Sequence, residues 1–304
     1  MRIVFMGTPD FAVASLDAMI KAGFDIVGVV TAPDKPSGRG QKIAESAVKK
    51  YATEHNLKVL QPVKLKDPGF ISELRALKAD LQIVVAFRML PEIVWNMPPK
   101  GTINLHASLL PQYRGAAPIN WAILNGDKES GVTTFFLQHE IDTGNILFKE
   151  KIDIQEDMTA GELHDKLMFV GAELLVKTIK AVESGDYVEK PQDQFAAETL
   201  VHAPKIFKED CEIDWNSNTK QVYNLIRGMS PYPTAFTSLN GKGLKIFAAE
   251  KQEKSVGIKA GEFITDNKTY LKFATSDGLI SIKELQLEGK KRMKIDEFLR
   301  GTKL

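Results

Sequence analysis

Residues 2–30 read RIVFMGTPDFAVASLDAMIKAGFDIVGVV, and this stretch decides the fold. Arg2–Met6 is a short apolar run. Phe11–Ala22 carries apolar residues at helical spacing and stops at Gly23, and Ile26–Val30 is a second apolar run with β-branched residues. A strand, a helix and a strand in this order predict a β-α-β unit, in which the two strands are parallel.

The same alternation continues along the first two thirds of the chain. It predicts three more helices, over Ala44–Asn56, Phe70–Lys78 and Met158–Ser184, and two more strands, over Val59–Gln61 and Leu81–Ala86. The last strand is nearly unbroken in its apolar character, as expected for a strand buried on both faces. Asp157 or Thr159 is expected to cap the start of the longest helix and Gly185 its end. We therefore predict an α/β domain with a doubly wound, parallel-rich sheet.

Composition changes after the polar stretch Asp186–Pro204, which contains two prolines. Beyond a short helix at Thr219–Arg227, turn dipeptides such as Asn240-Gly241 separate short alternating segments, and this pattern predicts a small antiparallel β-barrel. These segments are Ala235–Leu239, Leu244–Ala249, Gly261–Thr265, Thr269–Ala274 and Leu279–Leu287. We expect a first domain over residues 1–189, a linker over 190–206 and a second domain over 207–304.

Length and composition limit the class of protein. The chain has 304 residues, 43% of them hydrophobic and 26% charged, which is typical of a folded protein of two domains. No segment has the apolar length of a membrane span, and Met1–Gly7 lacks the features of a signal peptide. The single cysteine, Cys211, excludes an internal disulfide and favours a reducing cytoplasm.

The net charge of +1 is unevenly distributed. Residues 207–304 carry 17 Lys and Arg against 13 Asp and Glu, a net charge of +4, which leaves −3 for residues 1–206. A mildly basic second domain suits a polyanionic partner, but an ordinary solvated surface has the same composition. The cationic run at residues 290–294 is open to both interpretations.

Polar side chains gather in the stretch Asn104–Gly115, which reads NLHASLLPQYRG. In an extended segment residues two apart project to the same face, so Asn104 and His106 are expected to point into one pocket. A second polar cluster, Asp142–Asn145, follows an alternating stretch and offers a carboxylate to the imidazole. Asn104, His106 and Asp142 form a candidate catalytic constellation.

Other interpretations of these residues remain open. His106 alone is compatible with an ordinary packing role, but its position at the carboxyl end of a strand, where open α/β sheets bind ligands, favours catalysis. A metal site formed by His106, His139 and Asp142 is disfavoured, because the spacing of the last two is not helical and no cysteine joins them. The remaining histidines, His55, His164 and His202, have no comparable surroundings.

Two loops of the sequence are candidate binding sites. Gly7-Thr8-Pro9-Asp10 stands where a dinucleotide-binding protein carries its phosphate loop, but one glycine is too few for that motif, so a structural turn is expected and no NAD. The segment Pro33–Lys42 contains two prolines, two glycines and three cations. It is expected to be neither helix nor strand and to stand in solvent, where it either contacts phosphates or is merely hydrated.

The motifs together resemble those of the methionyl-tRNA formyltransferase family. The resemblance covers nearly the whole chain. It rests on residues 7–11 (GTPDF), 38–40 (GRG), 104–118 (NLHASLLPQYRGAAP), 142–144 (DTG), 213–215 (IDW) and 230–233 (SPYP). The central motif and the Asp-Thr-Gly are shared with other folate-dependent formyltransferases, including the enzyme acting on glycinamide ribonucleotide. The first pentapeptide, the Gly-Arg-Gly loop and the C-terminal barrel favour the tRNA enzymes.

The resemblance implies a Rossmann-like formyltransferase domain followed by an OB-like tRNA-binding domain. It implies 10-formyltetrahydrofolate as donor and the methionine amino group of initiator methionyl-tRNA as acceptor, in translation initiation, with neither metal nor NAD. Asn104 and His106 would serve the oxyanion, and Asp142 would polarise His106 or relay the amine proton. The folate pocket would comprise Phe87, Met89, Leu90, Ser108, Leu109, Leu110 and Pro111. The tRNA contacts would come from Lys35, Arg39 and Lys42. A monomer is expected.

This sequence departs from the family pattern at three positions. Phe87-Arg88 replaces a common Tyr-Gly, Asn145 a frequent Asp, and Gln41 a frequent cation. Three rival functions stay open: a formyltransferase acting on glycinamide ribonucleotide or a nucleotide sugar, a formyltetrahydrofolate hydrolase that uses water as nucleophile, and a nucleic-acid-binding module built on the barrel. The last leaves the Asn-His-Asp set unexplained.

Overall fold

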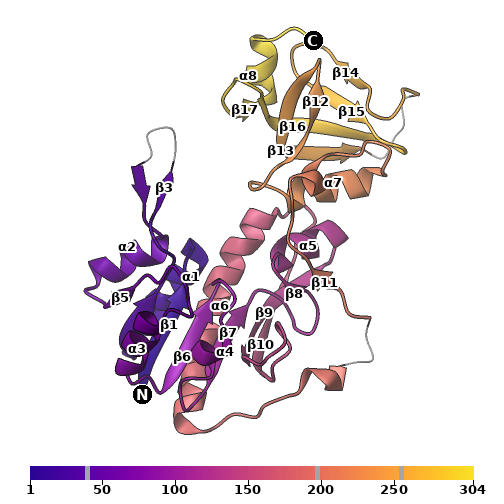
Figure 1. Cartoon of the computed structure of the whole chain (residues 1–304). Coiled ribbons are helices and arrows are strands. Elements are labelled where there is room, and N and C mark those ends of the chain that lie inside the picture. Colours follow the sequence, from indigo (N-terminus) through magenta and orange to yellow (C-terminus); the bar gives the residue numbers. More distant parts are fainter. Residues whose placement is uncertain (38–41, 196–198, 253–256) are drawn as a thin grey trace. The chain divides into compact units, whose positions relative to one another are not determined.

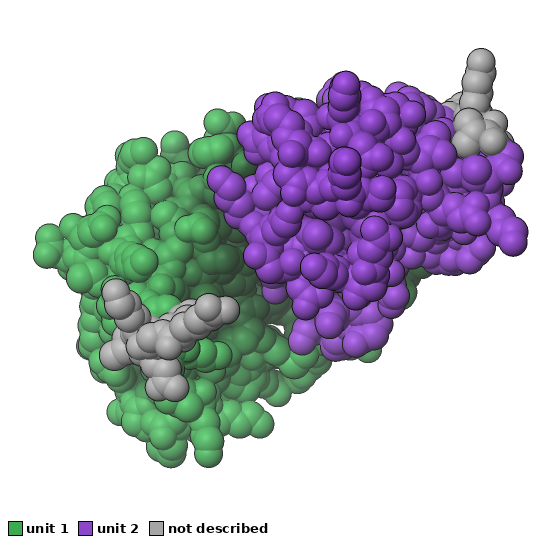
Figure 2. Space-filling model, turned by 90° about the horizontal axis from the view of Figure 1, so that it is seen from above, with its two compact units in different colours: residues 1–115, 131–152, 164–202 green, residues 116–130, 153–163, 203–304 purple. Residues whose placement is uncertain are grey.

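The computed structural model describes residues 1–37, 42–195, 199–252 and 257–304 (Figure 1). The chain forms two compact units, coloured separately in Figure 2. Unit 1 consists of Met1–Gly115, Gly131–Ile152 and His164–His202, and unit 2 of Ala116–Ser130, Asp153–Leu163 and Ala203–Leu304. The division into residues 1–189, 190–206 and 207–304 stays a prediction.

Unit 1 is built on a seven-stranded sheet with the strand order β10-β9-β7-β6-β1-β2-β5. Strands β7, β6, β1, β2 and β5 pair in parallel, and β9 pairs antiparallel with β7. The strands are β1 Arg2–Gly7, β2 Asp25–Val30, β5 Val59–Leu60, β6 Leu81–Val85, β7 Thr102–His106, β9 Glu129–Phe136 and β10 Ile146–Asp153. The predicted parallel-rich α/β domain is confirmed.

Helices cover this sheet because its central strands are apolar on both faces. Val4 and Met6 pack in a core cluster with residues of α3 and α4. Gly171 of α6 lies against Leu105 of β7, where a Cβ atom would come within 2.9 Å of that side chain. The helices are α1 Asp10–Lys21, α2 Ala47–Glu54, α3 Pro68–Ala76, α4 Glu92–Trp95 and α6 Ala160–Ser184, followed by the 3-10 turn η1 Gln192–Phe195.

The helix ends follow the predicted capping chemistry. Thr159 and Glu162 exchange hydrogen bonds between side chain and backbone at the start of α6, which confirms Thr159 as the cap. Gly185, with a φ of 80°, ends that helix. Ser46 accepts a hydrogen bond from the Lys49 amide at the start of α2.

The expectation that Pro33–Lys42 contains no strand is wrong. β3 (Lys35–Ser37) pairs antiparallel with β4 (Lys42–Ala44), and Pro36 stands opposite Ile43. A two-stranded ribbon consists only of edge strands, where a proline removes no ladder hydrogen bond if its nitrogen faces outward. The ribbon also moves the start of the following helix from the expected Ala44 to Ala47.

Unit 2 contains a six-stranded sheet in which every adjacent pair is antiparallel, as predicted. Its order is β12-β13-β16-β15-β14, with β17 also on β16. Its elements are α7 Thr219–Gly228, β12 Ala235–Leu239, β13 Lys242–Gln252, β14 Phe263–Thr265, β15 Leu271–Ala274, β16 Leu279–Leu287, β17 Met293–Lys294 and α8 Ile295–Arg300, with α5 Pro118–Asn125 and the 3-10 turn η2 Glu209–Cys211. A second apolar core, which includes Phe273 and Ile280, fills it.

Buried Arg227 joins the separate segments of unit 2. Its guanidinium donates to the carbonyls of Met158 and Ile123, at 3.0 and 3.3 Å, and to the side chain of Asn224 at 2.9 Å. Burial lowers the pKa of this guanidinium, and the three acceptors partly replace the water that it loses. Arg227 therefore links α7 to Ile123 in α5, which precedes residues 131–152, and to Met158, which follows them. Across both units, no helix within the described residues is long and apolar enough to cross a membrane.

Candidate active site

β7 brings Asn104 and His106 to the carboxyl edge of the parallel strands of unit 1. Asn104 pairs with Val84 of β6, and His106 pairs with Thr133 of β9. The two side chains stand two residues apart on one strand and so share a face, as predicted. The Asn104 side chain is half-buried and forms no hydrogen bond within the described residues, so its amide is available to a ligand.

The His106 ring is buried and held by one hydrogen bond. Its Nε2 atom lies 2.9 Å from the backbone oxygen of Tyr113, and only 7% of the residue is exposed. A carbonyl oxygen only accepts, so Nε2 must carry a hydrogen. This contact leaves Nδ1 as the ring atom available for chemistry.

Asp142 faces that second nitrogen. Its Oδ2 atom lies 3.9 Å from His106 Nδ1, and the same oxygen accepts a hydrogen bond of 3.0 Å from the Gly115 amide. The Asp142 side chain is 12% exposed. A separation of 3.9 Å exceeds a hydrogen bond, so the two groups are adjacent without being joined. The predicted meeting of imidazole and carboxylate is present.

The turn after β7 is fixed to β9. Thr133 Oγ1 donates to the Ser108 carbonyl at 2.6 Å and accepts from the Leu110 amide at 3.1 Å. The Ser108 hydroxyl is itself occupied by the Gln112 carbonyl, at 2.6 Å. Of the expected folate residues here, Ser108, Leu110 and Pro111 are buried and Leu109 is half-buried. Most of them therefore shape the turn and offer a ligand little side-chain surface.

The segment after β6 is more open. Met89 is 73% exposed, Phe87 is half-buried and Leu90 belongs to the apolar core. Arg88, one of the departures from the family pattern, donates to the backbone oxygens of Pro62 and Val63. It thereby joins the loop after β5 to the loop after β6, both at the carboxyl edge of the sheet.

The expected tRNA residues lie on and beside the β3–β4 ribbon. Lys35 is exposed and begins β3, and Lys42 begins β4. Arg39 lies outside the described residues, together with Gly38, Gly40 and Gln41.

His139 contacts residues outside the Asn-His-Asp set. It lies 3.6 Å from Glu92 and makes an edge contact with Trp95, and its side chain is 75% exposed. In the part of the chain that the structure describes, no three His, Cys, Asp or Glu side chains gather as a metal site would require.

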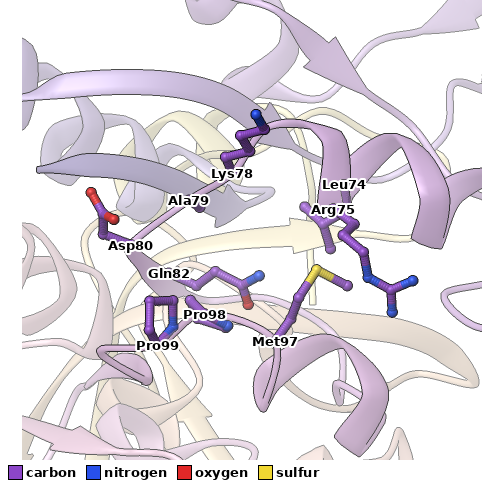
Figure 3. A pocket seen from close by; sticks show the side chains of 9 residues that line it. All are labelled: Leu74, Arg75, Lys78, Ala79, Asp80, Gln82, Met97, Pro98 and Pro99. Atoms are coloured by element: carbon purple, nitrogen blue, oxygen red, sulfur yellow. The ribbon is translucent and has the colours of Figure 1, made fainter.

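A cavity of about 320 Å³ opens at the opposite, amino-terminal edge of the sheet (Figure 3). Gln82, near the start of β6, and Met97 line it, together with side chains from α3 and the loop before β7. Because β6 runs from this edge toward His106, the cavity is separate from the Asn-His-Asp set.

Sequence reasoning missed Gln192 and Arg114 as parts of the site. Gln192 donates hydrogen bonds to the carbonyls of Asp142 and Gly144, both at 2.8 Å, and accepts from the Arg114 guanidinium. Arg114 stood in the central motif without an assigned role. Gln192 lies in the stretch expected to be a linker, and no local pattern distinguishes it from a surface glutamine.

This arrangement can perform acyl transfer. An amide donor and an imidazole on one strand can stabilise a developing oxyanion, and a carboxylate beside the imidazole can accept a proton. Residues 1–179 match the formyl transferase family and residues 205–303 its C-terminal domain family. Fold and site therefore define a formyl transferase.

Curated relatives show which kind of formyl transferase this chain resembles. Methionyl-tRNA formyltransferase of Bacteroides fragilis is 56% identical, with 100% of this chain and 96% of the relative covered. The enzymes of that name from Flavobacterium johnsoniae and Porphyromonas gingivalis are 51% and 49% identical, with at least 99% of this chain and 96% of each relative covered. The chain belongs to the methionyl-tRNA formyltransferase family, which confirms the resemblance drawn from its motifs.

Solved structures share the fold at low identity. An N-formyltransferase of Helicobacter canadensis, in complex with folinic acid and dTDP-3-aminofucose, aligns with a TM-score of 0.70 at 22% identity over 96% of this chain and 99% of that chain. HypX of Aquifex aeolicus, in complex with tetrahydrofolic acid, aligns with a TM-score of 0.65 at 22% identity over 99% of this chain and 48% of that chain.

Proposed function

We propose that this chain transfers the formyl group of 10-formyltetrahydrofolate to the amino group of methionine on initiator methionyl-tRNA, in translation initiation. The observation that carries the chemistry is the approach of His106 Nδ1 to Asp142 at 3.9 Å, beside Asn104 on the same strand face. The tRNA acceptor rests on family membership over the whole chain.

The reaction needs one oxyanion donor and one route for a proton. The methionine nitrogen attacks the formyl carbon and the carbonyl oxygen becomes an oxyanion. The C=O bond then re-forms as the bond to N10 of the folate breaks, and N10 leaves with the proton that the amine has lost. Asn104 donates to the oxyanion, a contact worth roughly 3–4 kcal/mol in comparable enzymes. His106 Nδ1 donates to it when the ring is protonated and accepts the amine proton when the ring is neutral. Asp142 lies where it can accept that proton in turn.

The remaining roles belong to the same proposal. Phe87, Met89 and Leu109 offer side-chain surface to the folate, while Leu90, Ser108, Leu110 and Pro111 fix the backbone around it. Lys35, Arg39 and Lys42, which belong to the β3–β4 ribbon and the residues between its strands, contact phosphates of the acceptor arm. Such contacts supply affinity without reading sequence. The protein acts as a monomer in the cytoplasm, without metal or NAD.

A product assay tests the function. The purified protein is incubated with the formyl donor and with methionyl-tRNA, with glycinamide ribonucleotide, or with no acceptor. The expected result is N-formylmethionyl-tRNA in the first reaction and no product in the second. Formylation of the ribonucleotide would identify the rival transferase, and release of formate without acceptor would identify the hydrolase.

A further inference from the structure

We propose that Gln192 is a positioning residue, which acts on turnover by fixing Asp142 opposite His106; the proposal rests on the formyl transfer proposed above. Gln192 begins the 3-10 turn Gln192–Phe195 and is 4% exposed. Its side-chain amide is neutral and contacts neither the Asn104 amide, nor the His106 ring, nor the Asp142 carboxylate. Its effect must therefore pass through the backbone that carries Asp142.

All the hydrogen-bonding capacity of the Gln192 amide is used. Its nitrogen donates to the Asp142 and Gly144 carbonyls, both at 2.8 Å. Its oxygen accepts from Arg114 Nε at 3.0 Å and from Arg114 Nη2 at 2.6 Å. A flipped amide would set its oxygen against two carbonyls and its NH2 against a cation, so only one orientation fits.

The backbone at Asp142 needs such support. Its φ is 55°, in the left-handed region that side-chain-bearing residues rarely adopt. Gly144, two residues on, is packed so closely that a Cβ atom would lie 1.6 Å from the Phe136 carbonyl. Gln192 bonds to the carbonyls at both of these positions and so holds the turn in the conformation that aims the carboxylate.

Arg114 connects this support to the imidazole. The residue before it, Tyr113, accepts the hydrogen bond from His106, and the residue after it, Gly115, donates to Asp142. The Gln192–Arg114 contact therefore joins the segment Tyr113–Gly115, which contacts both His106 and Asp142, to the turn that carries Asp142. Loss of Gln192 frees the turn relative to Tyr113–Gly115 and lengthens the 3.9 Å distance between His106 Nδ1 and Asp142 Oδ2.

The test compares Gln192→Leu with wild type and with Gln194→Leu, a matched change at an exposed position of the same 3-10 turn. For Gln192→Leu we expect kcat to fall about tenfold to a hundredfold, the usual cost of a displaced catalytic group. The KM values for folate and for methionyl-tRNA stay within about twofold, because neither binding surface changes. Gln194→Leu keeps the wild-type kcat.

A double-mutant cycle separates positioning from general stability. In an Asp142→Asn background the Gln192→Leu change should lower kcat by less than about twofold, because its target is already lost. An equal loss in both backgrounds would show that Gln192 does not act through Asp142. If Gln192→Leu does not fold, Gln192→Glu takes its place, since it keeps an acceptor for Arg114 and loses both donors. If the wild-type protein forms no formylmethionyl-tRNA, the proposed function is wrong. If the wild-type protein is active and the Gln192 variant is equally active, only the proposed role of Gln192 is wrong.

Discussion

His106 has one ring nitrogen left for chemistry, because the Tyr113 carbonyl occupies the other. We expect His106→Ala to lower kcat by about 100-fold or more, as loss of a general acid–base group does, and Asn104→Ala and Asp142→Ala to lower it strongly as well. Single-turnover rates measure this, with thermal unfolding as the check that each variant is folded. Near-native turnover in His106→Ala would show that His106 neither stabilises the oxyanion nor moves the amine proton.

His139→Ala is the control for that experiment. Its exposed ring contacts Glu92 and Trp95, so its loss should leave kcat unchanged. A mechanism through a metal held by His106, His139 and Asp142 predicts instead that both histidine variants are equally damaged.

Gly144 gives a second test at the scale of one residue. A methyl group there would meet the Phe136 carbonyl at 1.6 Å, and a backbone atom cannot yield as a flexible side chain can. We expect Gly144→Ala to displace the turn that carries Asp142, to lower kcat, and to destabilise the protein by about 1–3 kcal/mol. Gly301→Ala, at a site with open space, is the control and should change neither kcat nor the urea midpoint. An unaltered kcat in Gly144→Ala would mean that the Asp142 turn tolerates displacement.

At the scale of elements, the sequence predicts best where one physical cause dominates. The unit β1-α1-β2 follows from apolar periodicity alone. Thr159 caps the start of α6 and Gly185 ends the helix, and both effects depend only on neighbouring residues. Asn104 and His106 are found from their two-residue spacing on a strand. The β3–β4 ribbon is missed because cross-strand pairing outweighs the low strand propensity of Pro36. Gln192 is missed because its partners stand about fifty and eighty residues earlier in the chain, which no local pattern reports.

The start of α7 supplies a pH-dependent prediction. Asp277 accepts from the Thr219 amide and hydroxyl, both at 2.7 Å, and these hydrogen bonds hold the pKa of its carboxyl below the ordinary value of 3.8. A carboxyl whose pKa is lower in the folded state stabilises the fold above pH 3.8, and this contribution is lost as the pH falls through the lowered value.

We therefore expect Asp277→Asn to destabilise the protein at pH 7 by about 0.5–1 kcal/mol, within the usual net contribution of a hydrogen bond. The difference from wild type should shrink as the pH is lowered below 4. Urea unfolding at several pH values measures it, with exposed Asp186→Asn as control. A difference that persists undiminished at the lowest pH would contradict the assignment of the effect to ionised Asp277.

At the scale of the whole molecule, the groups proposed for chemistry and for tRNA affinity differ in their exposure. The Asn-His-Asp set is buried or half-buried in unit 1, whereas Lys35 is exposed on the β3–β4 ribbon of the same unit and residues 207–304 carry a net charge of +4. Buried, short-range contacts at the reacting groups are little affected by salt, whereas contacts between cations and phosphates release counterions and weaken as salt rises. Salt should therefore raise the KM for tRNA and leave kcat nearly constant.

The β3–β4 ribbon and the residues between its strands allow this salt dependence to be measured residue by residue. Arg39→Ala and Lys35→Ala should each raise the KM for methionyl-tRNA at low salt and reduce the slope of log KM against log salt by about one, because one phosphate contact is lost. The KM for folate should not change, since the pocket is untouched. Lys180→Ala, which removes an exposed cation from α6, controls for the loss of charge as such. If the rate at subsaturating tRNA is the same in Arg39→Ala as in wild type, this ribbon does not bind the acceptor arm, and the salt dependence must then be traced to the basic residues of unit 2.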